Sequence, residues 1–477
     1  MAEDGFILTV REVVEATGGD LLRGAPGAFF TGVSTDSRRA GAGDLFIPLA
    51  GERFDGHDYL GEAVRGGAAG FLVRKGSEAK IGDGGPDAAV IRVEDTLHAL
   101  GEIARAWRSR FDVPVAALTG SSGKTTTKEM AAAIAGLRRE VLRSEGNFNN
   151  LVGLPLTLLG MRDRHETAIL EMGTNRRGEI ARLTEIAKPV IGLITNIGSA
   201  HLEGFGTVET VAEEKRDLFN HMGGDGIAVI NMDDPVLASW VGRYRKSYFT
   251  YGTAGEAMVR AEDIRAEAAA ATRFTLRIGE SSAEVRLNAA GRCNVSNALG
   301  AAALCWCMGI DMDAICEGLS GFRPVPGRME IVPLDNGSFV INDSYNANPE
   351  SVRAALATLV ESAGSSAFTT AVLGDMLELG PGSERLHREI GVFAARTGVG
   401  RIFVRGDFAA AVAAGAREGG LREEDVIRLD PPRRIAEEIG KSSRRGDWVL
   451  VKGSRRMRME EVFQALADVI GITEKSA

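Results

Sequence analysis

Short apolar runs separated by glycine-rich turns make up the first hundred residues of the chain. Residues 44–50 and 68–73 are apolar stretches of strand length, whereas residues 57–67 are typical of a helix that ends at paired glycines. Residues 98–111 carry apolar positions at helical spacing and lead into a different pattern. The pattern predicts a small α/β unit, joined to the rest of the chain by a helical connector.

A second rhythm begins at residue 113, where a buried strand runs directly into a helix over residues 123–137. Apolar runs that alternate with helices indicate a parallel sheet covered on both faces. Residues 273–288 break this rhythm with a strand, a turn and a strand, and we interpret them as a small antiparallel addition. Further strands, each followed by a polar loop, are expected at 167–173, 190–198 and 226–235.

Two prolines and a glycine within residues 322–330 mark a boundary before a third unit. Beyond it, four apolar strands break into polar residues, at the carboxyl ends where open parallel sheets bind their ligands. Their strings are SFVINDSYNANPES, TTAVLGDMLELG, RIFVRGDF and DWVLVKGSR, and helices are expected at 350–361, 384–397 and 457–469. The chain is therefore predicted to be an α/β protein of three domains, 1–98, 99–324 and 325–477.

Composition narrows the classes of protein to which the chain can belong. Its 477 residues are 44% apolar and 25% charged, which is ordinary for a soluble globular protein of several domains. A net charge of −9 disfavours a nucleic-acid partner. The acidic start and the lack of a long apolar run favour a cytoplasmic protein without membrane insertion. No CxxC pair or zinc spacing occurs among the four cysteines, Cys293, Cys305, Cys307 and Cys316.

The string LTGSSGKTTTKEM begins at Leu118 and is the first candidate for chemistry. The general phosphate-binding loop has a glycine at the place of Leu118, whereas this chain carries Gly120 two residues later. A strand, a glycine turn and a helix still suit phosphate, because a helix N-terminus presents unpaired N–H groups. Lys124 could reach the β- and γ-phosphates of a nucleotide, and the Thr125 hydroxyl suits Mg²⁺. The alternative is a glycine turn that merely opens a helix.

Three further side chains are candidate site residues only if this loop binds a nucleotide. Glu171 ends a predicted strand and could supply a hard oxygen ligand for Mg²⁺, although a strand-end glutamate is commonly a turn or cap residue. His201 also follows a strand, where a lone histidine is usually only solvated. Lys215 lies on a carboxylate-rich helix, and its spacing alone favours a solvated face with i,i+4 ion pairs.

Polar loops around and beyond the second boundary offer more candidates. Residues 342–351 follow a strand and form either a plain turn or a loop that contacts a ribose or base. Asn294 and Asn297 lie three positions apart at a helix start, where N-capping is the simpler interpretation. Residues 451–455, VKGSR, close the last strand with a lysine and an arginine that face the expected cleft.

Together these segments resemble one family, the ATP-dependent Mur ligases of peptidoglycan synthesis with their folylpolyglutamate synthetase relatives. The family loop is T-G-x-x-G-K-[TS], and TGSSGKT at residues 119–125 fits it without change. The resemblance implies an N-terminal UDP-sugar-binding domain, a central P-loop ATPase-type sheet and a C-terminal Rossmann-like domain. It extends through STDSRRAGAGDLFIPLAGERFDGHDY, EGNFNNLVGLPLTLL, LEMGTNRRGEI, TNIGSAHLEGFGT, EEKRDLF, PVPGRMEI, DSYNANPES, GDMLELG and VKGSR.

The resemblance also implies a reaction. DSYNANP together with GDMLELG is similar to the family member that acts last, and the D-N-P-R string of the diaminopimelate-adding member is absent. The implied substrates are ATP with Mg²⁺, UDP-N-acetylmuramoyl-tripeptide and D-alanyl-D-alanine, joined through an acyl phosphate by a monomeric cytoplasmic ligase. The third residue of the tripeptide stays open. The alternatives are an amino-acid-adding Mur ligase, a folylpolyglutamate synthetase-like ligase, or a P-loop ATPase switch that ligates nothing.

Residue roles follow from matching each motif to the family. The implied catalytic residues are Lys124, Glu171, His201, Lys215 and Arg328, of which Glu171, His201 and a carbamylated Lys215 would hold Mg²⁺ with Thr125. The implied nucleotide contacts are Thr119, Gly120, Ser121, Ser122, Gly123, Lys124, Thr125, Thr126, Asn294, Asn297, Arg328, Asp343 and Asn348. UDP-sugar contacts are assigned to Ser34, Asp36, Arg38, Phe54, Asp55, Gly56 and His57, and peptide contacts to Asn149, Asn150, Asn346, Lys452, Ser454 and Arg455. Cys293 departs from the family, which often has histidine there, because a thiol cannot replace an imidazole as a charged contact.

Overall fold

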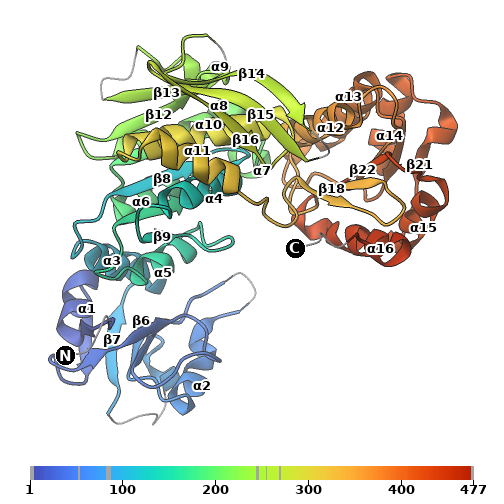
Figure 1. The fold of residues 1–477 in the computed structure, drawn as a ribbon. Coiled ribbons are helices and arrows are strands. Elements are labelled where there is room, and N and C mark those ends of the chain that lie inside the picture. The colour runs from blue at the N-terminus through green and yellow to red at the C-terminus, as the bar shows by residue number, and fades with distance from the viewer. Residues whose placement is uncertain are drawn as a thin grey trace.

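Three bodies follow one another along the chain, each built around its own sheet (Figure 1). The computed structural model describes residues 5–51, 54–81, 87–242, 247–253, 255–267 and 270–473. The N-terminal body lies below the central body in Figure 1, and the C-terminal body lies to one side of it.

The N-terminal body holds a five-stranded sheet of order β2-β7-β6-β5-β4, parallel except for the β2–β7 pair. Phe46 and Phe71 pack edge to face within its core. Its elements are β1 (Leu8–Thr9), α1 (Val10–Thr17), β2 (Asp20–Arg23), β3 (Phe29–Phe30), β4 (Gly32–Ser34), β5 (Asp44–Phe46), the 3₁₀ helix η1 (Gly56–Tyr59), α2 (Leu60–Arg65), β6 (Gly70–Arg74), η2 (Glu78–Ile81) and β7 (Ala89–Val93).

The first half of the central body alternates strands with helices. Its elements are α3 (Thr96–Arg108), β8 (Val115–Thr119), α4 (Lys124–Ala135), β9 (Val141–Arg143), α5 (Gly153–Leu159), β10 (Thr167–Glu171), α6 (Glu179–Ala187), β11 (Ile191–Ile194), α7 (Leu202–Phe205) and α8 (Val208–His221). The second half adds β12 (Ile227–Asn231), α9 (Pro235–Ala238), β13 (Tyr248–Gly252), β14 (Val259–Glu267), β15 (Ala271–Ile278), β16 (Ser281–Leu287), α10 (Arg292–Cys307) and α11 (Met312–Gly321).

These strands form one nine-stranded sheet of order β16-β15-β14-β13-β12-β11-β8-β10-β9. The seven strands from β14 to β9 in this order, β8 included, pair in parallel, and β14, β15 and β16 pair antiparallel at one edge. Apolar residues of α4, α10 and α11 cover one face, and those of α3, α5, α6 and α8 cover the other. Cover on both faces explains why the parallel strands read as continuous apolar runs.

The C-terminal body has a six-stranded sheet of order β17-β18-β22-β19-β20-β21, parallel except for the β17–β18 pair. Apolar residues of helices α12, α13 and α14 cover one face, and those of α15 and α16 cover the other. Its elements are β17 (Glu330–Pro333), β18 (Phe339–Asp343), α12 (Pro349–Ala363), β19 (Thr369–Leu373), η3 (Gly380–Gly382), α13 (Ser383–Thr397), β20 (Arg401–Val404), α14 (Ala409–Glu418), η4 (Glu423–Asp425), β21 (Val426–Arg428), α15 (Pro432–Ser442), β22 (Trp448–Lys452), η5 (Arg455–Met457) and α16 (Glu460–Ile470).

The predicted α/β class with parallel sheets is confirmed, and so is the antiparallel pair at 273–288. That pair extends the central sheet through β13 and β14, two strands that the apolar pattern did not indicate. The strand predicted over 44–50 ends at Phe46, because Pro48 follows and has no N–H for a ladder. The helix predicted over 57–67 divides into η1 and α2.

Two helices of the C-terminal body, α14 and α15, were not expected from the sequence. The last helix begins at Glu460 instead of residue 457, because η5 precedes it. Within the residues that the structure describes, no helix combines the length and apolar character needed to cross a membrane. We keep 1–98, 99–324 and 325–477 as proposed domain boundaries, of which the first falls within α3.

Candidate active site

The glycine loop between β8 and α4 is shaped by two close approaches of the backbone. Gly120 (φ 150°) and Gly123 (φ 79°) both have positive φ. A Cβ on Gly120 would lie 1.8 Å from Thr195 Oγ1, and one on Gly123 would lie 2.3 Å from Asn297 Oδ1. Leu118 is fully buried in β8 and belongs to the strand. The loop therefore tolerates only glycine at two places and opens directly into the N-terminus of α4.

Lys124 begins α4, and its Nζ donates a 2.7 Å hydrogen bond to the carbonyl oxygen of Gly120. Burial lowers the pKa of this lysine, Glu171 opposes the shift, and the positive charge of Arg328 adds to it. Because the ammonium group is poorly solvated and has a second cation nearby, an anionic ligand would be bound favourably there.

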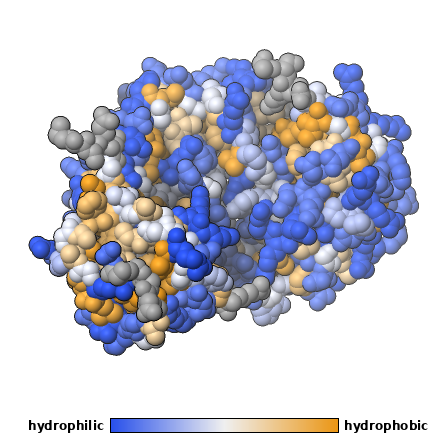
Figure 2. Space-filling model, turned by 90° about the horizontal axis from the view of Figure 1, so that it is seen from below, coloured by the Kyte–Doolittle hydropathy of each residue, from blue (hydrophilic) through white to orange (hydrophobic). Residues whose placement is uncertain are grey.

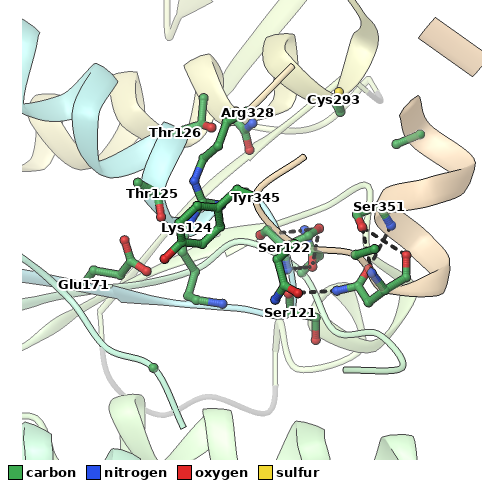
Figure 3. Close-up of a pocket in the computed structure, with 18 of the residues that line it drawn as sticks. Ser121, Ser122, Lys124, Thr125, Thr126, Glu171, Cys293, Arg328, Tyr345 and Ser351 are labelled. Atoms are coloured by element: carbon green, nitrogen blue, oxygen red, sulfur yellow. Dashed lines mark hydrogen bonds between the residues drawn. The ribbon is translucent and has the colours of Figure 1, made fainter. Parts of the chain in front are cut away.

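A cavity of about 420 Å³ opens over this loop, between the central and C-terminal bodies (Figure 3). Two predicted nucleotide contacts do not line it: Thr119 is buried at the end of β8, and Gly120 uses its carbonyl oxygen to hold Lys124. The predicted residues that line it are Ser121, Ser122, Gly123, Lys124, Thr125, Thr126, Asn149, Asn150, Glu171, His201, Lys215, Asn294, Asn297, Arg328, Asp343, Asn346, Asn348 and Lys452.

Glu171 ends β10 and points into the cavity with a side chain that is almost fully buried (Figure 3). Its Oε1 accepts a 2.8 Å hydrogen bond from Asn149 Nδ2, whereas its Oε2 is buried without a hydrogen-bond partner. An unsatisfied buried carboxylate oxygen is costly unless a ligand completes it. Nowhere in the described part of the chain do three His, Cys, Asp or Glu side chains come together so that they could hold a metal ion, so Mg²⁺ here would also need phosphate and water oxygens.

Lys215 of α8 is almost fully buried in the wall of the cavity, so the solvated helix face favoured by its spacing is wrong. Burial and the positive charge of Lys124 lower its pKa to about 7, against the attraction of Glu214. The Glu214 carboxylate is occupied by the backbone N–H groups of Gly178 and Ile180 at the start of α6. Lys215 is therefore partly neutral at physiological pH and available for chemistry at its amine.

The C-terminal body supplies the opposite wall. The Arg328 guanidinium lies 4.0 Å from the ring centroid of Tyr345, a cation–π contact that fixes its position over the loop (Figure 3). Asp343 accepts from Met329 N–H and pairs with the Lys452 ammonium group. Lys452 lines the cavity, as expected, and its charge is paired with that of Asp343 within the wall.

Helix α10 places three predicted positions at the cavity. Gly291 is its N-cap, so neither Asn294 nor Asn297 has the capping role that their spacing favoured. Asn297 Nδ2 donates to Asn294 Oδ1 at 3.2 Å, which leaves a row of amides beside the loop. Burial and the nearby Asp343 carboxylate raise the pKa of the Cys293 thiol to about 11, so it is a neutral wall residue.

A second cavity of about 150 Å³ adjoins the first. Ser454 and Arg455, the last predicted peptide contacts, line this cavity and not the larger one. Asn348 Nδ2 donates to the carbonyl oxygen of Ser121 at 3.1 Å, which joins the C-terminal body to the loop. Several lining residues were not predicted from the sequence; among them Tyr345, Asn196 and Glu378 lie inside motifs quoted above, whereas Arg456 lies just beyond one.

The predicted UDP-sugar residues lie in the N-terminal body, away from both cavities. Asp36 and Arg38 form an exposed ion pair at 2.7 Å, and Phe54 is 60% exposed. His57 is buried: its Nδ1 lies 2.6 Å from Asp55 Oδ1, and its Nε2 accepts from Arg74 N–H at 3.0 Å. Ser34 and Gly56 also belong to this body, at β4 and η1.

Comparison with known proteins places this geometry in context. Residues 29–108 match "Mur ligase family, catalytic domain", residues 118–305 match "Mur ligase middle domain", and residues 327–455 match "Mur ligase, glutamate ligase domain". The UDP-N-acetylmuramoyl-tripeptide–D-alanyl-D-alanine ligase of Escherichia coli is 37% identical over 94% of this chain and 97% of its own length. The enzyme of that name from Bacillus subtilis is 36% identical, over 92% and 93%.

Two solved structures are similar over nearly the whole chain. MurF from Acinetobacter baumannii is 31% identical, with a TM-score of 0.88 over 98% of this chain and 99% of its own. MurF ligase from Thermotoga maritima in complex with ADP is 30% identical, with a TM-score of 0.81 over 91% and 97%. The family resemblance predicted from the motifs is confirmed.

Proposed function

The chain belongs to the Mur ligase family, and from this premise we propose that it adds D-alanyl-D-alanine to UDP-N-acetylmuramoyl-tripeptide at the expense of ATP. The observation that carries the proposal is the pairing of a phosphate-binding loop with an incomplete carboxylate, Glu171, in one cavity. The relatives of that name from Escherichia coli and Bacillus subtilis match over more than nine-tenths of their length, so the same activity is proposed for the whole chain.

The reaction needs ATP because a carboxylate and an ammonium ion do not condense at neutral pH. A carboxylate oxygen of the tripeptide attacks the γ-phosphorus, ADP leaves, and an acyl phosphate forms. The dipeptide amine, having lost a proton, then attacks the acyl carbon, and inorganic phosphate leaves with the C–O bond electrons. The protein mainly positions the reactants and balances the charge that gathers on the transferring phosphoryl group.

The cavity supplies these functions from both bodies. Lys124 and the N–H groups at the start of α4 would bind the phosphates, and Arg328 would add positive charge from the facing wall. Thr125, Glu171 and His201 would hold Mg²⁺, which neutralises phosphate charge when bound. The residues present fit this metal, because Glu171 has a buried oxygen without a partner.

Lys215 would complete the site as a carbamate. A neutral amine adds CO₂ at its lone pair and loses a proton, which converts a cation into an anionic oxygen ligand. The lowered pKa of Lys215, about 7, provides the neutral amine at physiological pH. The change would also remove the repulsion between Lys215 and Lys124.

We assign the dipeptide to the second cavity. D-Alanyl-D-alanine carries a carboxylate, and Arg455, which pairs with Glu460 at 3.2 Å, lines that cavity together with Ser454 and could exchange this partner for the ligand. Asn346 lines both cavities and could contact either peptide. Asn149 and Asn150, across the larger cavity, would face the tripeptide.

The uridine end of the large substrate is assigned to the N-terminal body. Ser34 ends β4, Asp36 and Arg38 follow it, and the loop from Phe54 to His57 belongs to the same body, where Asp55 forms a bridge with Ala50. Figure 2 shows a hollow between the N-terminal body on the left and the C-terminal body on the right, bordered mostly by hydrophilic side chains. An extended nucleotide-linked peptide could cross this hollow to reach the loop.

The test is to incubate the protein with ATP, Mg²⁺, UDP-N-acetylmuramoyl-tripeptide and D-alanyl-D-alanine and to identify the product by mass. The expected result is the pentapeptide, with one ADP and one phosphate for each bond formed. Product formation with D-glutamate or diaminopimelate in place of the dipeptide would assign another Mur ligase activity. ATP hydrolysis at full rate without any amine would favour a P-loop ATPase switch instead.

A further inference from the structure

Glu378, which is not among the predicted site residues, connects the C-terminal body to His201, the candidate metal ligand in the central body. Glu378 lies in the loop after β19 of the C-terminal body, and its Oε2 lies 2.6 Å from Nδ1 of His201 in the central body. Both residues line the second cavity, and His201 also lines the larger one. The contact therefore lies at the junction of the two candidate ligand sites.

The backbone holds the same two segments together. Glu203 N–H donates a 2.9 Å hydrogen bond to the carbonyl oxygen of Glu378, and Leu202 of α7 packs against the C-terminal core. His201 (φ 56°) and Glu378 (φ 63°) both adopt the left-handed conformation, which is uncommon for residues other than glycine. Strained backbone of this kind persists where the surrounding structure over-determines it. The contact is thus held by packing, by a backbone hydrogen bond and by the two side chains together.

The chemistry of the contact assigns the proton on the ring. The Glu378 Oε2 atom lies 2.6 Å from Nδ1 of His201, which is hydrogen-bond distance. An ionised carboxylate can only accept, so Nδ1 of His201 donates. In the neutral ring Nε2 then keeps the lone pair with which histidine binds a metal. Metal-binding histidines commonly donate their other N–H to a carboxylate, which sets the tautomer and the ring orientation.

We propose that Glu378 is a positioning residue for His201, so that the C-terminal body completes the orientation of a metal ligand carried by the central body. The inference rests on the proposed function only in assigning His201 to Mg²⁺. It makes metal binding and docking of the two bodies reciprocal: whatever stabilises one favours the other.

The test uses full-length protein labelled with ¹⁵N-histidine, whose six histidines give resolvable ring signals. His201→Gln identifies the ring of interest. We expect a neutral Nδ1–H tautomer of His201 in the wild type and in Glu378→Gln, whose amide oxygen can still accept. In Glu378→Ala this preference should disappear, and binding of Mn²⁺ with ADP, followed by electron paramagnetic resonance, should weaken about tenfold.

Glu361→Gln is the matched control, because it removes one exposed charge from the same body on α12. It should change neither the His201 ring signals nor Mn²⁺ binding. An Nε2–H tautomer in the wild type would overturn the proposal even if Glu378→Ala failed to fold. Unchanged ring signals or unchanged Mn²⁺ binding in a folded Glu378→Ala protein would overturn it as well. No ligation is measured, so the outcome does not depend on which peptides are joined.

Discussion

The nucleotide cavity and the candidate UDP-sugar residues differ in how much of each site exists before a ligand arrives. At the cavity, glycines, a strand end and a helix N-terminus hold Lys124 and Glu171 in place, and Glu171 keeps an unpaired oxygen. In the N-terminal body, Asp36 and Arg38 pair with each other in solvent, and the His57 ring is fully engaged inside the fold.

The difference reflects how much preformed structure the role of each site requires. A transferring phosphoryl group needs preorganised charge, because donors that must first reorganise stabilise the transition state poorly. A uridine or sugar far from the reacting atoms needs only affinity, which exposed groups can provide by exchanging partners. We therefore expect substitutions at the cavity to lower kcat, and substitutions in the N-terminal body to raise KM.

The largest effect is expected from Lys124→Ala. Loss of the ammonium group removes the charge that would bind the phosphates, and ligation should fall by about 10³-fold or more. Coupled measurement of ADP release gives the rate, and circular dichroism checks the fold. Lys441→Ala, at an exposed position of α15, is the control and should keep its activity. Near-normal turnover of Lys124→Ala would refute the loop assignment.

Glu171→Gln should come next, because it keeps the volume of the side chain and removes its charge. We expect kcat to fall by about 10²-fold as a metal ligand is lost. The thermal midpoint of unfolding should stay equal or rise, since the variant no longer buries a carboxylate oxygen without a partner. A lower midpoint together with normal kcat would show that Glu171 serves the fold and not the reaction.

Lys215 should make activity depend on pH and on CO₂. Its pKa of about 7 means that the amine becomes protonated as pH falls from 8 to 6, and only the neutral amine adds CO₂. We expect kcat to decline several-fold over this range and to fall in CO₂-free buffer at pH 8. Lys215→Arg, which keeps its charge at every accessible pH, should be insensitive to CO₂.

The lowered pKa of Lys215 makes the folded state more stable as pH rises, whereas a lysine in an ion pair, whose pKa is raised, makes it less stable. The pKa of Lys215 in the folded protein, about 7, lies well below that of an ordinary lysine side chain, so the unfolded chain binds more protons between pH 7 and about 10. The cost of burying this lysine is therefore largest below pH 7 and decreases as pH rises.

For the activity measurement, a kcat that is independent of both pH and CO₂ would contradict the carbamate at Lys215.

Arg38→Ala should have the smallest effect and fall on a different parameter. Its guanidinium is exposed and forms an ion pair with Asp36, so we expect KM for the UDP-linked substrate to rise about twofold with kcat nearly unchanged. Steady-state kinetics with the other substrates saturating separate the two parameters. A fall in kcat equal to that of Glu171→Gln would end the distinction between the two sites.

Short sequence motifs predicted those parts of the site that are formed by residues adjacent in the sequence. The loop from Thr119 to Thr125 was found because its glycines, lysine and helix start are adjacent in the sequence. Glu171 was found because it ends an apolar strand. The spacing of Lys215 indicated a solvated face, because periodicity does not reveal which charged residue of a polar helix faces a cavity.

Contacts between distant segments could not be predicted in this way. The Glu378–His201 pair joins residues in different bodies, and no single-sequence pattern connects them. His57 was assigned to a ligand from its motif, yet tertiary packing uses both of its ring nitrogens. Helix α14 was not predicted because its alanines give a weak amphipathic pattern.

The most direct test of the account uses tripeptide substrate with ¹⁸O in its terminal carboxylate. Transfer of the γ-phosphoryl group to that carboxylate predicts one ¹⁸O atom in each phosphate released, together with a product that contains D-alanyl-D-alanine. Phosphate without ¹⁸O, formed at the same rate as the pentapeptide, would contradict an acyl phosphate in this cavity.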